Sequence, residues 1–355
     1  MGGVDSLSYP LVLPATALDT AEAQPEMNSW QELVTPKTPL LDSFPDCALV
    51  DLTHLGLIRL AGPDLRTFLQ GQVTNDVRQV TPELAQLNSH CSPKGRMLGS
   101  FWIIQRGDDF YLQLPAERLE PLLKRLRMFV LRAQVQVEDA SGELVRCGIA
   151  GDCTADLLPF VPAEPGQTIT RDGITVLRLP GDRSRFEILA PPEQLTPVWQ
   201  TMAANAVQTG SNFWTLMDIR AGVPSVYDET ADAFVPQMTN LQLIGGVSFT
   251  KGCYTGQEVV ARMQYLGTLK RRMYRVHVDS PQCPAPGMSL HSASSESGQG
   301  AGRIVSAAPA PEGGFEALAV IQISSAEADD LHLVDGDGPR LRLLDLPYAF
   351  PVPED

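Results

Sequence analysis

Residues 251–258, K-G-C-Y-T-G-Q-E, form the most informative segment of this sequence. Thr255 and Glu258 have the spacing of a capping box, in which the threonine side chain accepts from an amide of the first helical turn and the glutamate accepts from the amide of the threonine. Glu258 also precedes Arg262 by four residues, the favourable order for an ion pair along a helix. We therefore predict a short strand at 247–249, a turn, and a helix that Thr255 caps.

Cys253 lies just before this predicted helix and two residues after Lys251. The positive end of a helix and a nearby ammonium group both favour the thiolate, which is the nucleophilic form of cysteine. Gly252 leaves room for a ligand or a partner to approach the backbone. These features indicate a reactive thiol with Lys251 as its catalytic neighbour, whereas the alternative is a small buried side chain, as most isolated cysteines are.

The cysteine spacing excludes the usual zinc and iron–sulfur ligand motifs, because none of the six cysteines forms a C-x-x-C pair. The first residues, M-G-G-V-D-S, lack the positive segment of a signal peptide, and no apolar run approaches the ~18–20 residues that span a bilayer. Scattered cysteines without an export signal are typical of free thiols in a reducing compartment. We therefore predict a cytoplasmic protein without a metal site, in which no role is assigned to Cys47, Cys91, Cys147, Cys153 or Cys283.

The net charge of the chain argues against one broad class of function. The sequence has 27 Lys and Arg against 42 Asp and Glu, which gives a formal net charge of −15. Because binding to phosphate by bulk electrostatics needs a basic surface, direct nucleic-acid binding is not expected. The amphipathic helix predicted at 116–132 carries a local group of cations, which we interpret as a solvated face, with a patch that faces an anion or RNA as the alternative. These cations are Lys124, Arg125, Arg127 and Arg132.

The sequence divides into three parts. Residues 1–45 are rich in Pro, Thr, Ser and acidic side chains and predict an irregular tail. Residues 46–268 mix strand and helix signals, among them a strand at 56–60, a short helix that Gly71 ends, and a hairpin of strands 101–105 and 110–114. In residues 269–355, short strand-like runs between Pro-, Gly- and Ser-rich turns predict a small β-barrel or sandwich. The runs are 274–278, 303–305, 318–323, 331–334 and 341–344.

Residues 251–258, together with Arg262, resemble the signature of the YgfZ family, folate-binding proteins similar to the glycine-cleavage T-protein that are linked to iron–sulfur enzymes and tRNA modification. Other segments resemble the same family in order along the chain, so the resemblance covers about residues 47–350. These segments are L-I-R-L-A-G-P-D at 57–64, F-L-Q-G-Q-V-T-N-D at 68–76, S-P-K-G-R at 92–96, Trp214 with 219–224, and F-V-P-Q-M-T-N-L at 234–241.

The resemblance implies an α+β fold. An aminomethyltransferase (T-protein)-like folate-binding module of two α+β subdomains would occupy residues 46–268, and a C-terminal β-barrel domain residues 269–355. Tetrahydrofolate or a derivative is the implied cofactor. Trp214 matches a tryptophan that contacts folate in the family, and its indole face suits a flat pterin ring, while core packing is the alternative. Leu55 falls near a second tryptophan of relatives and can supply apolar contact. The resemblance adds Asn75, Gln237, Asn240 and Arg262 as cofactor-binding residues.

Two departures from the relatives bear on chemistry. The aminomethyltransferases have a G-G-I-I-D-D type segment whose carboxylate lies beside the reacting folate nitrogen, whereas residues 95–100 read G-R-M-L-G-S. A one-carbon transfer to that nitrogen needs a group that exchanges or orients a proton. Relatives also have a glutamate that binds the pterin edge where this chain has Arg220, which can donate but not accept a hydrogen bond. Asp218 is the nearest carboxylate that could compensate.

The resemblance implies a non-classical accessory protein rather than an ordinary enzyme. It would bind folate and use Cys253 to assemble or repair the clusters of iron–sulfur client enzymes, such as those that methylthiolate tRNA. One alternative is a folate-dependent one-carbon (aminomethyl) transferase or demethylase, which the missing acid disfavours. Another is a folate-independent scaffold in which Trp214 is merely packed. We interpret His54 as a packed or capping residue rather than a base.

Overall fold

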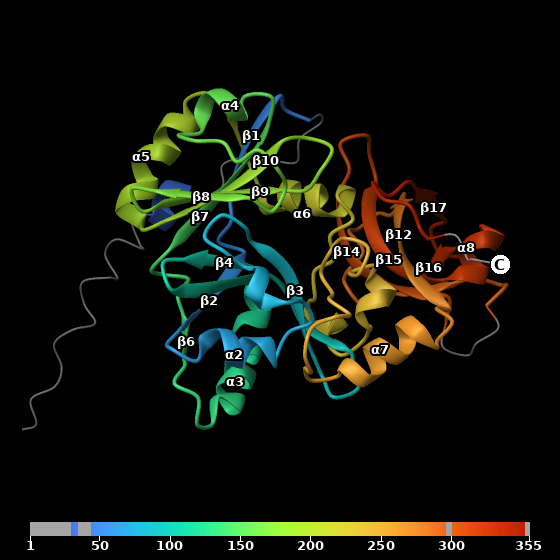
Figure 1. Cartoon of the computed structure of the whole chain (residues 1–355). Helices are drawn as coiled ribbons and strands as arrows, with labels where there is room; N and C mark the ends of the chain where they lie inside the picture. Colours follow the sequence, from blue (N-terminus) through green and yellow to red (C-terminus); the bar gives the residue numbers. More distant parts are fainter. Residues whose placement is uncertain (1–29, 35–43, 296–299, 352–355) are drawn as a thin grey trace, which may run out of the picture.

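The computed structural model describes residues 30–34, 44–295 and 300–351 (Figure 1). Most of the segment predicted as an irregular tail lies outside these residues. Within it, residues 30–34 form a helical turn. Trp30 of this turn is fully buried and packs edge-on against Trp199, with the ring centroids 5.6 Å apart. The segment before residue 46 therefore includes a turn that belongs to the folded core.

The first sheet has five antiparallel strands in the order β3-β4-β5-β2-β6. Two helices cover one of its faces, where buried leucines from both helices pack on strand residues such as Ile58 and Phe110. The predicted hairpin is confirmed as β4 and β5, and the helix predicted at 116–132 begins with a 3-10 turn, η2, and continues as α3. The elements are β2 (Leu55–Ala61), α2 (Leu65–Gln70), β3 (Gln86–Cys91), β4 (Met97–Arg106), β5 (Asp109–Pro115), η2 (Ala116–Arg118), α3 (Leu119–Val130) and β6 (Gln136–Asp139).

The second sheet has six strands in the order β11-β1-β7-β10-β9-β8. One face packs on α5 through Leu195, Trp199 and Met202, and the other faces the first sheet across a shared apolar core. The elements are β1 (Cys47–Asp51), β7 (Val145–Gly151), α4 (Thr154–Leu157), β8 (Thr168–Arg171), β9 (Ile174–Leu179), β10 (Arg185–Ala190), α5 (Pro192–Ala203), β11 (Val207–Thr209) and α6 (Ser211–Arg220).

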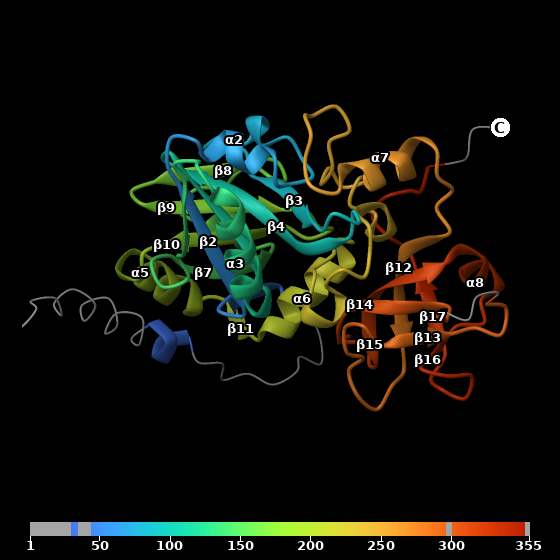
Figure 2. The ribbon, with the colours of Figure 1, turned by 90° about the horizontal axis from the view of Figure 1, so that it is seen from below.

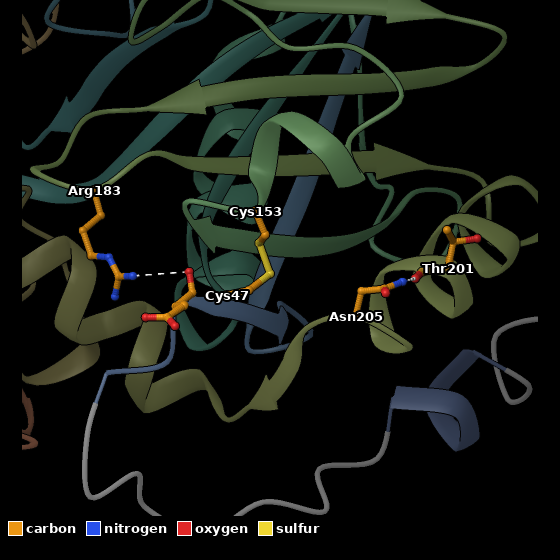
Figure 3. The surroundings of a disulfide bond; sticks show 6 residues. Cys47, Cys153, Arg183, Thr201 and Asn205 are labelled. Atoms are coloured by element: carbon orange, nitrogen blue, oxygen red, sulfur yellow. Dashed lines mark hydrogen bonds between the residues drawn. A yellow bond between two sulfur atoms is a disulfide. The ribbon is translucent and has the colours of Figure 1, made fainter.

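A disulfide joins Cys47 at the start of β1 to Cys153 just before α4, with the two Cα atoms 5.5 Å apart (Figure 3). The expectation that all six cysteines are free is therefore wrong for this pair. The sequence could not predict the bond, because 106 residues separate the two cysteines and only the β1–β7 pairing brings them together. Of the remaining four, Cys91 and Cys147 are buried, whereas Cys253 and Cys283 are exposed.

The C-terminal part is a curled six-stranded sheet, a half-barrel in the order β16-β13-β14-β15-β12-β17. All five predicted strand-like runs fall on strands of this sheet, except that Ile323 begins a helix and β16 is shorter than its run. The elements are β12 (Arg271–Val278), β13 (Ser289–His291), β14 (Gly302–Pro309), β15 (Phe315–Gln322), α8 (Ile323–Ala328), β16 (His332–Leu333) and β17 (Leu341–Leu344).

The half-barrel packs on the rest of the chain through α6, which contacts β14 and β15. Between α6 and β12 the chain forms turns, two 3-10 turns and one helix, α7 (Gln257–Tyr265). Helices α2, α3 and α7 lie along the lower face in Figure 1, which Figure 2 views directly. The segment 251–258 therefore belongs to the same face as α2 and α3.

Candidate functional site

Lys251 anchors the loop that carries the candidate thiol. Its ammonium group donates to the carbonyl oxygens of Gln70, Val73 and Asn75, at 2.7, 2.6 and 2.8 Å. An ammonium group has three N–H donors, so all of them are engaged. Burial lowers the pKa of Lys251 to about 8, and the nearby Asp76 opposes this effect. We interpret Lys251 as the anchor of the loop, because no donor is left for the thiol that it was predicted to assist.

Gly256 ends the anchored loop and is the N-cap of α7. Its φ is 86°, and a Cβ atom at this position would lie 2.4 Å from the carbonyl oxygen of Ser92 and 2.9 Å from the Cα of Gly95. Two backbone turns thus meet at a pair of glycines, both with positive φ, where any larger residue would clash. The predicted capping box is wrong, because Thr255 lies before the N-cap and no side chain caps the helix.

Two further local predictions around this helix are also wrong. Residues 247–249 form no strand, although the amide of Ser248 donates to the carbonyl oxygen of Thr74. Glu258 and Arg262 are both exposed, and no ion pair within 4.0 Å joins them in the described part of the chain. The side chains of Glu258 and Arg262 therefore do not stabilise the helix through an ion pair with each other.

Cys253 is exposed between two buried neighbours. Lys251 is anchored on one side, and on the other side Tyr254 is buried with its ring centroid 5.1 Å from the Lys251 ammonium nitrogen. The carbonyl oxygen of Tyr254 accepts from the amide of Gln257 in the first turn of α7. A Cβ atom at Gly252 would meet no atom within 4 Å, so the space beside the thiol is open. The loop holds the thiol outward at a fixed place, which suits reaction with a molecule that approaches from outside.

The structure places Asn75 in the turn that Lys251 holds. Its side-chain amide donates to the carbonyl oxygens of Leu87 and Gly245, at 3.3 and 2.6 Å. Its own amide donates to the side-chain oxygen of Asn88. These bonds tie the turn to β3 and to the segment that leads to the thiol, so the observed contacts of Asn75 are structural.

The other sequence-predicted polar residues lie near α7 and β12. Gln237 is buried and donates to the carbonyl oxygen of Val260 at 2.7 Å. Asn240 has a positive φ of 58° and donates to the carbonyl oxygen of Met273 at 2.8 Å. Arg262 is exposed on α7. Gln237 and Asn240 therefore connect α7 to the half-barrel, and their contact with a cofactor stays a prediction.

A cavity of about 460 Å³ lies where α6, the end of β5 and the half-barrel meet. Its wall combines apolar groups with several hydrogen-bonding side chains. A smaller cavity of about 40 Å³ shares part of this wall and reaches Trp214. Wall residues include His54, Leu55, Thr215, Asp218, Tyr227 and Glu229. Cys253 lines neither cavity, so the thiol and this cavity are two separate features of the molecule.

Asp218 is the carboxylate that lines both cavities. Its Oδ1 accepts from the guanidinium group of Arg185 at 2.8 Å, and 30% of the Asp218 side chain is exposed. Burial raises the pKa of Asp218, and the charge of Arg185 lowers it. In the part of the chain that the structure describes, no group donates to Oδ2. Asp218 thus lines the cavity with one carboxylate oxygen free to accept a hydrogen bond, and its contact with a cofactor in place of Arg220 stays a prediction.

Trp214 is a core residue that reaches the inner cavity. It is only 2% exposed, and a Cβ atom at Gly148 would lie 2.4 Å from its ring. The guanidinium carbon of Arg185 is 5.5 Å from the ring centroid. Leu55 lines both cavities, as expected for an apolar contact. Stacking of Trp214 on folate stays a prediction, since most of its surface is already covered by protein.

Arg220 faces the half-barrel instead of the cavity. Its guanidinium group donates to Glu316 at 2.6 Å, lies 3.3 Å from Glu312, and covers the ring of Phe44 at 4.3 Å. Glu316 is buried and also accepts from Arg275 at 2.8 Å. The arginine therefore joins α6 to β15 and does not line the cavity.

Ser100 ends the segment in which the aminomethyltransferases have an acid. Its hydroxyl donates to the carbonyl oxygen of Pro224 at 3.1 Å and accepts from the amide of Val226 at 3.2 Å. The serine thus holds the segment after α6. It offers the inner cavity no group that could take a proton at neutral pH.

A group of buried polar and charged side chains, which was not predicted from the sequence, lies between the two sheets. Gln113 donates to Glu187 at 2.7 Å, and Arg146 donates to the carbonyl oxygen of Leu55 at 2.6 Å. Several buried atoms of this group, to which His54 also belongs, have no hydrogen-bond partner. They are Nε and Nη1 of Arg146, Oε1 of Glu187, Oε1 of Gln113, and Nδ1 of His54. Burial raises the pKa of Glu187 to about 7. The only signal in the sequence was a charge inside each of two apolar, strand-like runs, V-R-C-G-I-A-G and R-F-E-I-L-A.

His90 connects α3 to the turn that Lys251 holds. Its Nδ1 lies 2.8 Å from the carbonyl oxygen of Gln72, and its Nε2 lies 2.9 Å from Nε of Arg125. Because the arginine nitrogen can only donate, Nε2 accepts and Nδ1 carries the hydrogen. Burial lowers the pKa of His90 to about 4, so the ring is neutral at physiological pH.

We expect the stability of the protein to fall as the pH drops from about 6.5 towards 4. In this window the unfolded chain binds a proton at His90 that the folded chain does not, so the free energy of unfolding decreases, by up to about 3 kcal/mol for this residue. Urea unfolding at a series of pH values measures the slope, and His90→Asn is expected to make it shallower. His54, whose pKa is also lowered to about 4, would still contribute to the slope in this variant. An unchanged slope in His90→Asn would show that His90 does not cause this pH dependence.

The overall fold is similar to that of a solved structure. The structure is similar to that of the glycine cleavage system aminomethyltransferase T from Bartonella henselae, with a TM-score of 0.71 over 91% of this chain and 96% of that chain. Sequence identity in this comparison is 16%, so the likeness establishes the fold and nothing more. The predicted α+β, T-protein-like fold is confirmed.

Sequence comparison identifies the family. A protein named tRNA-modifying protein YgfZ from Escherichia coli is 30% identical over 320 residues, which cover 89% of this chain and 97% of the relative. The protein of the same name from Photobacterium profundum is 32% identical over 313 residues, which cover 87% and 94%. The chain belongs to the YgfZ family. No family model matches it.

Two structural features are absent from the residues that the structure describes. No group of three or more His, Cys, Asp or Glu side chains there is placed to hold a metal ion. Likewise, none of the helices in these ranges is long and apolar enough to cross a membrane.

Proposed function

We propose that this chain is a cytoplasmic, folate-binding accessory protein that assembles or repairs iron–sulfur enzymes, those that methylthiolate tRNA among them, with Cys253 as its reactive group. The observation that carries the proposal is the exposed thiol on an anchored loop. A group that serves another protein must be reachable from outside and fixed in place. Cys253 meets both conditions. The chain also belongs to a family in which relatives carry the name tRNA-modifying protein.

The larger cavity fits the polar edge and the flat ring of a reduced folate. A pterin offers hydrogen-bond donors on one edge, and Asp218 presents a free carboxylate oxygen to the cavity. The unpartnered Nδ1 of His54 belongs to another residue of the same wall. Leu55 and Tyr227 supply apolar and aromatic surface for the ring. Tetrahydrofolate, when bound, supplies an acceptor for one-carbon units.

The chain's own residues support the accessory role over ordinary aminomethyl transfer. The segment 95–100 carries no acid, and the hydroxyl of Ser100 is occupied by the backbone of residues 224 and 226. Proton exchange at the folate nitrogen would need a free acid or base at this place. Asp218 and His54 would orient and hold the cofactor instead.

The test is a genetic one, with the second exposed cysteine as a matched control. In cells that lack the protein, Cys253→Ser is expected to fail to restore the activity of a tRNA-methylthiolating iron–sulfur enzyme, because a hydroxyl is a far weaker nucleophile and metal ligand than a thiolate. Cys283→Ser, which removes the other exposed cysteine of the described residues, is expected to restore it. Full activity with Cys253→Ser at normal protein levels would refute the role of the thiol.

A further inference from the structure

Helix α3 exposes a face that combines cations with large apolar side chains. Pro121, Lys124, Arg125 and Met128 follow one another at helical spacing, and Leu131 comes directly after the helix. We call these five residues the α3 stripe. Met128 is 66% exposed and Leu131 is 86% exposed. Two neighbouring exposed apolar side chains of this size are a feature of interaction surfaces.

Leu131 adds a second unusual property. Its backbone has φ 44° and ψ −101°, a conformation that a leucine adopts only at a cost. The side chain gains no burial in return, because 86% of it is exposed. An exposed apolar residue held in a strained conformation is better explained by an interaction with another molecule than by the stability of this chain.

The charge around the α3 stripe differs from that of the whole chain. A cavity of about 240 Å³ lies against the stripe, lined by the three cations Arg118, Lys124 and Arg125 and by apolar groups, with no acidic residue in its wall. Arg118 is neutralised by Asp228, with which it forms an ion pair at 2.5 Å. Lys124 is exposed and has no ion-pair partner within the described ranges. On a chain with net charge −15, this surface selects an anionic partner.

Hydrogen bonds connect the α3 stripe to the turn that holds the thiol loop. Arg125 of the stripe donates to His90, and His90 donates to the carbonyl oxygen of Gln72. Gln72 lies within the 70–75 turn, whose carbonyl oxygens Lys251 binds. Helices α3 and α7 also lie on the same face of the molecule (Figure 2). A partner that rests on the stripe thus lies on the face that carries α7, the helix that follows Cys253 in the chain.

The composition of the stripe favours a protein over RNA. Single-stranded RNA is recognised largely by stacking on aromatic or guanidinium planes, and the apolar members here are Met128, Leu131 and Pro121. The plane of Arg125 is already used, because it covers the ring of Phe129 at 5.4 Å. Methionine and arginine are enriched in protein interfaces, and methionine adapts to the shape of a partner.

From these contacts we infer that the α3 stripe is the docking surface for the protein on which Cys253 acts, and that the partner offers acidic side chains around an apolar centre. This inference rests on the proposed function, because it assumes that the thiol serves another protein. The apolar pair Met128 and Leu131 would fill the centre of the interface, and Lys124 would meet the acidic rim.

The inference can be tested with a purified tRNA-methylthiolating iron–sulfur enzyme as the probe. Its dissociation constant is measured by biolayer interferometry with the full-length chain and with the double variant Lys124→Glu/Met128→Glu. We expect binding to weaken at least tenfold in the variant. The matched control is Arg342→Glu/Val334→Glu, which changes the net charge equally at an exposed cation and an exposed apolar residue of the half-barrel, and which should bind like the wild type.

The outcomes separate this inference from the proposed function. Equal binding by both double variants, or no binding by the wild-type chain, would overturn the docking surface, whereas the genetic test of Cys253→Ser would stand on its own. Transfer RNA alone is the second probe. If it bound the wild type at physiological salt and lost affinity in Lys124→Glu/Met128→Glu but not in the control, the occupant would be RNA and the inference of a protein partner would be wrong.

Discussion

Replacing Lys251 with methionine is expected to lower the free energy of unfolding by about 3–5 kcal/mol, because it removes a buried cation from three backbone acceptors. The carbonyl oxygens of Gln70, Val73 and Asn75 would then lack their donor in a place that water reaches poorly. Methionine has a similar length, so the loss of packing is small and the effect reports mainly on the hydrogen bonds. The anchored loop would also lose its fixed position, and with it the defined place of Cys253.

Chemical denaturation of the wild type, Lys251→Met and Lys94→Met measures this effect. Lys94 lies on the neighbouring turn and is exposed, so its replacement removes the same charge without removing buried hydrogen bonds. We expect Lys94→Met to change the free energy of unfolding by less than about 0.5 kcal/mol. A difference below about 1 kcal/mol between the two variants would show that Lys251 does not anchor the loop.

Asp218→Asn is expected to weaken the binding of tetrahydrofolate by about 10- to 100-fold, the effect of losing one charge-assisted hydrogen bond. With Oδ1 held by Arg185, the carboxylate presents Oδ2 as an acceptor to the donor edge of a pterin, whereas the asparagine would present an amide donor at that place. The change is nearly isosteric, and Oδ1 can still accept from Arg185, so the wall of the cavity is preserved. Isothermal titration calorimetry of both proteins with tetrahydrofolate measures the change.

Glu229→Gln provides the control for Asp218→Asn, because it neutralises a second carboxylate of the same cavity. It is expected to leave the affinity within about threefold of the wild type. Trp214→Ala is a poorer probe, since replacing a tryptophan that is 2% exposed costs about 3–5 kcal/mol of stability. If neither carboxylate variant altered the affinity, recognition of the pterin by Asp218 would be wrong. If the wild type released no heat, the folate half of the proposed function would fail.

The fold could be predicted from the sequence because two independent signals agree. The apolar spacing of residues 116–132 and the strand-like runs after residue 270 are local patterns, and both became the expected elements. The order of the quoted segments along the chain added the architecture, which the structure confirms. Patterns of this kind depend only on residues close together in the chain, so they can be recognised from the sequence alone.

The details of the site could not be predicted in the same way. Thr255 and Glu258 have the spacing of a capping box, but the contact of Gly256 with Gly95 decides where the helix begins. That contact joins residues more than 150 positions apart, as does the anchoring of Lys251 on the 70–75 turn. The buried polar and charged group between the sheets also depends on long-range contacts, because three of its residues come from the separate strands β5, β7 and β10. Spacing along the chain carries no information about such approaches.

The arrangement of the six cysteines makes the protein suitable for labelling at a single site. Cys47 and Cys153 are bonded to each other, and burial raises the pKa of Cys91 to about 12 and that of Cys147 well above its usual value. Cys253 and Cys283 are then the two thiols that an alkylating reagent can reach in the folded chain. A chain with Cys283→Ser would accept one fluorophore or spin label at Cys253, so the distance from the thiol to a bound partner becomes measurable without any further change to the protein.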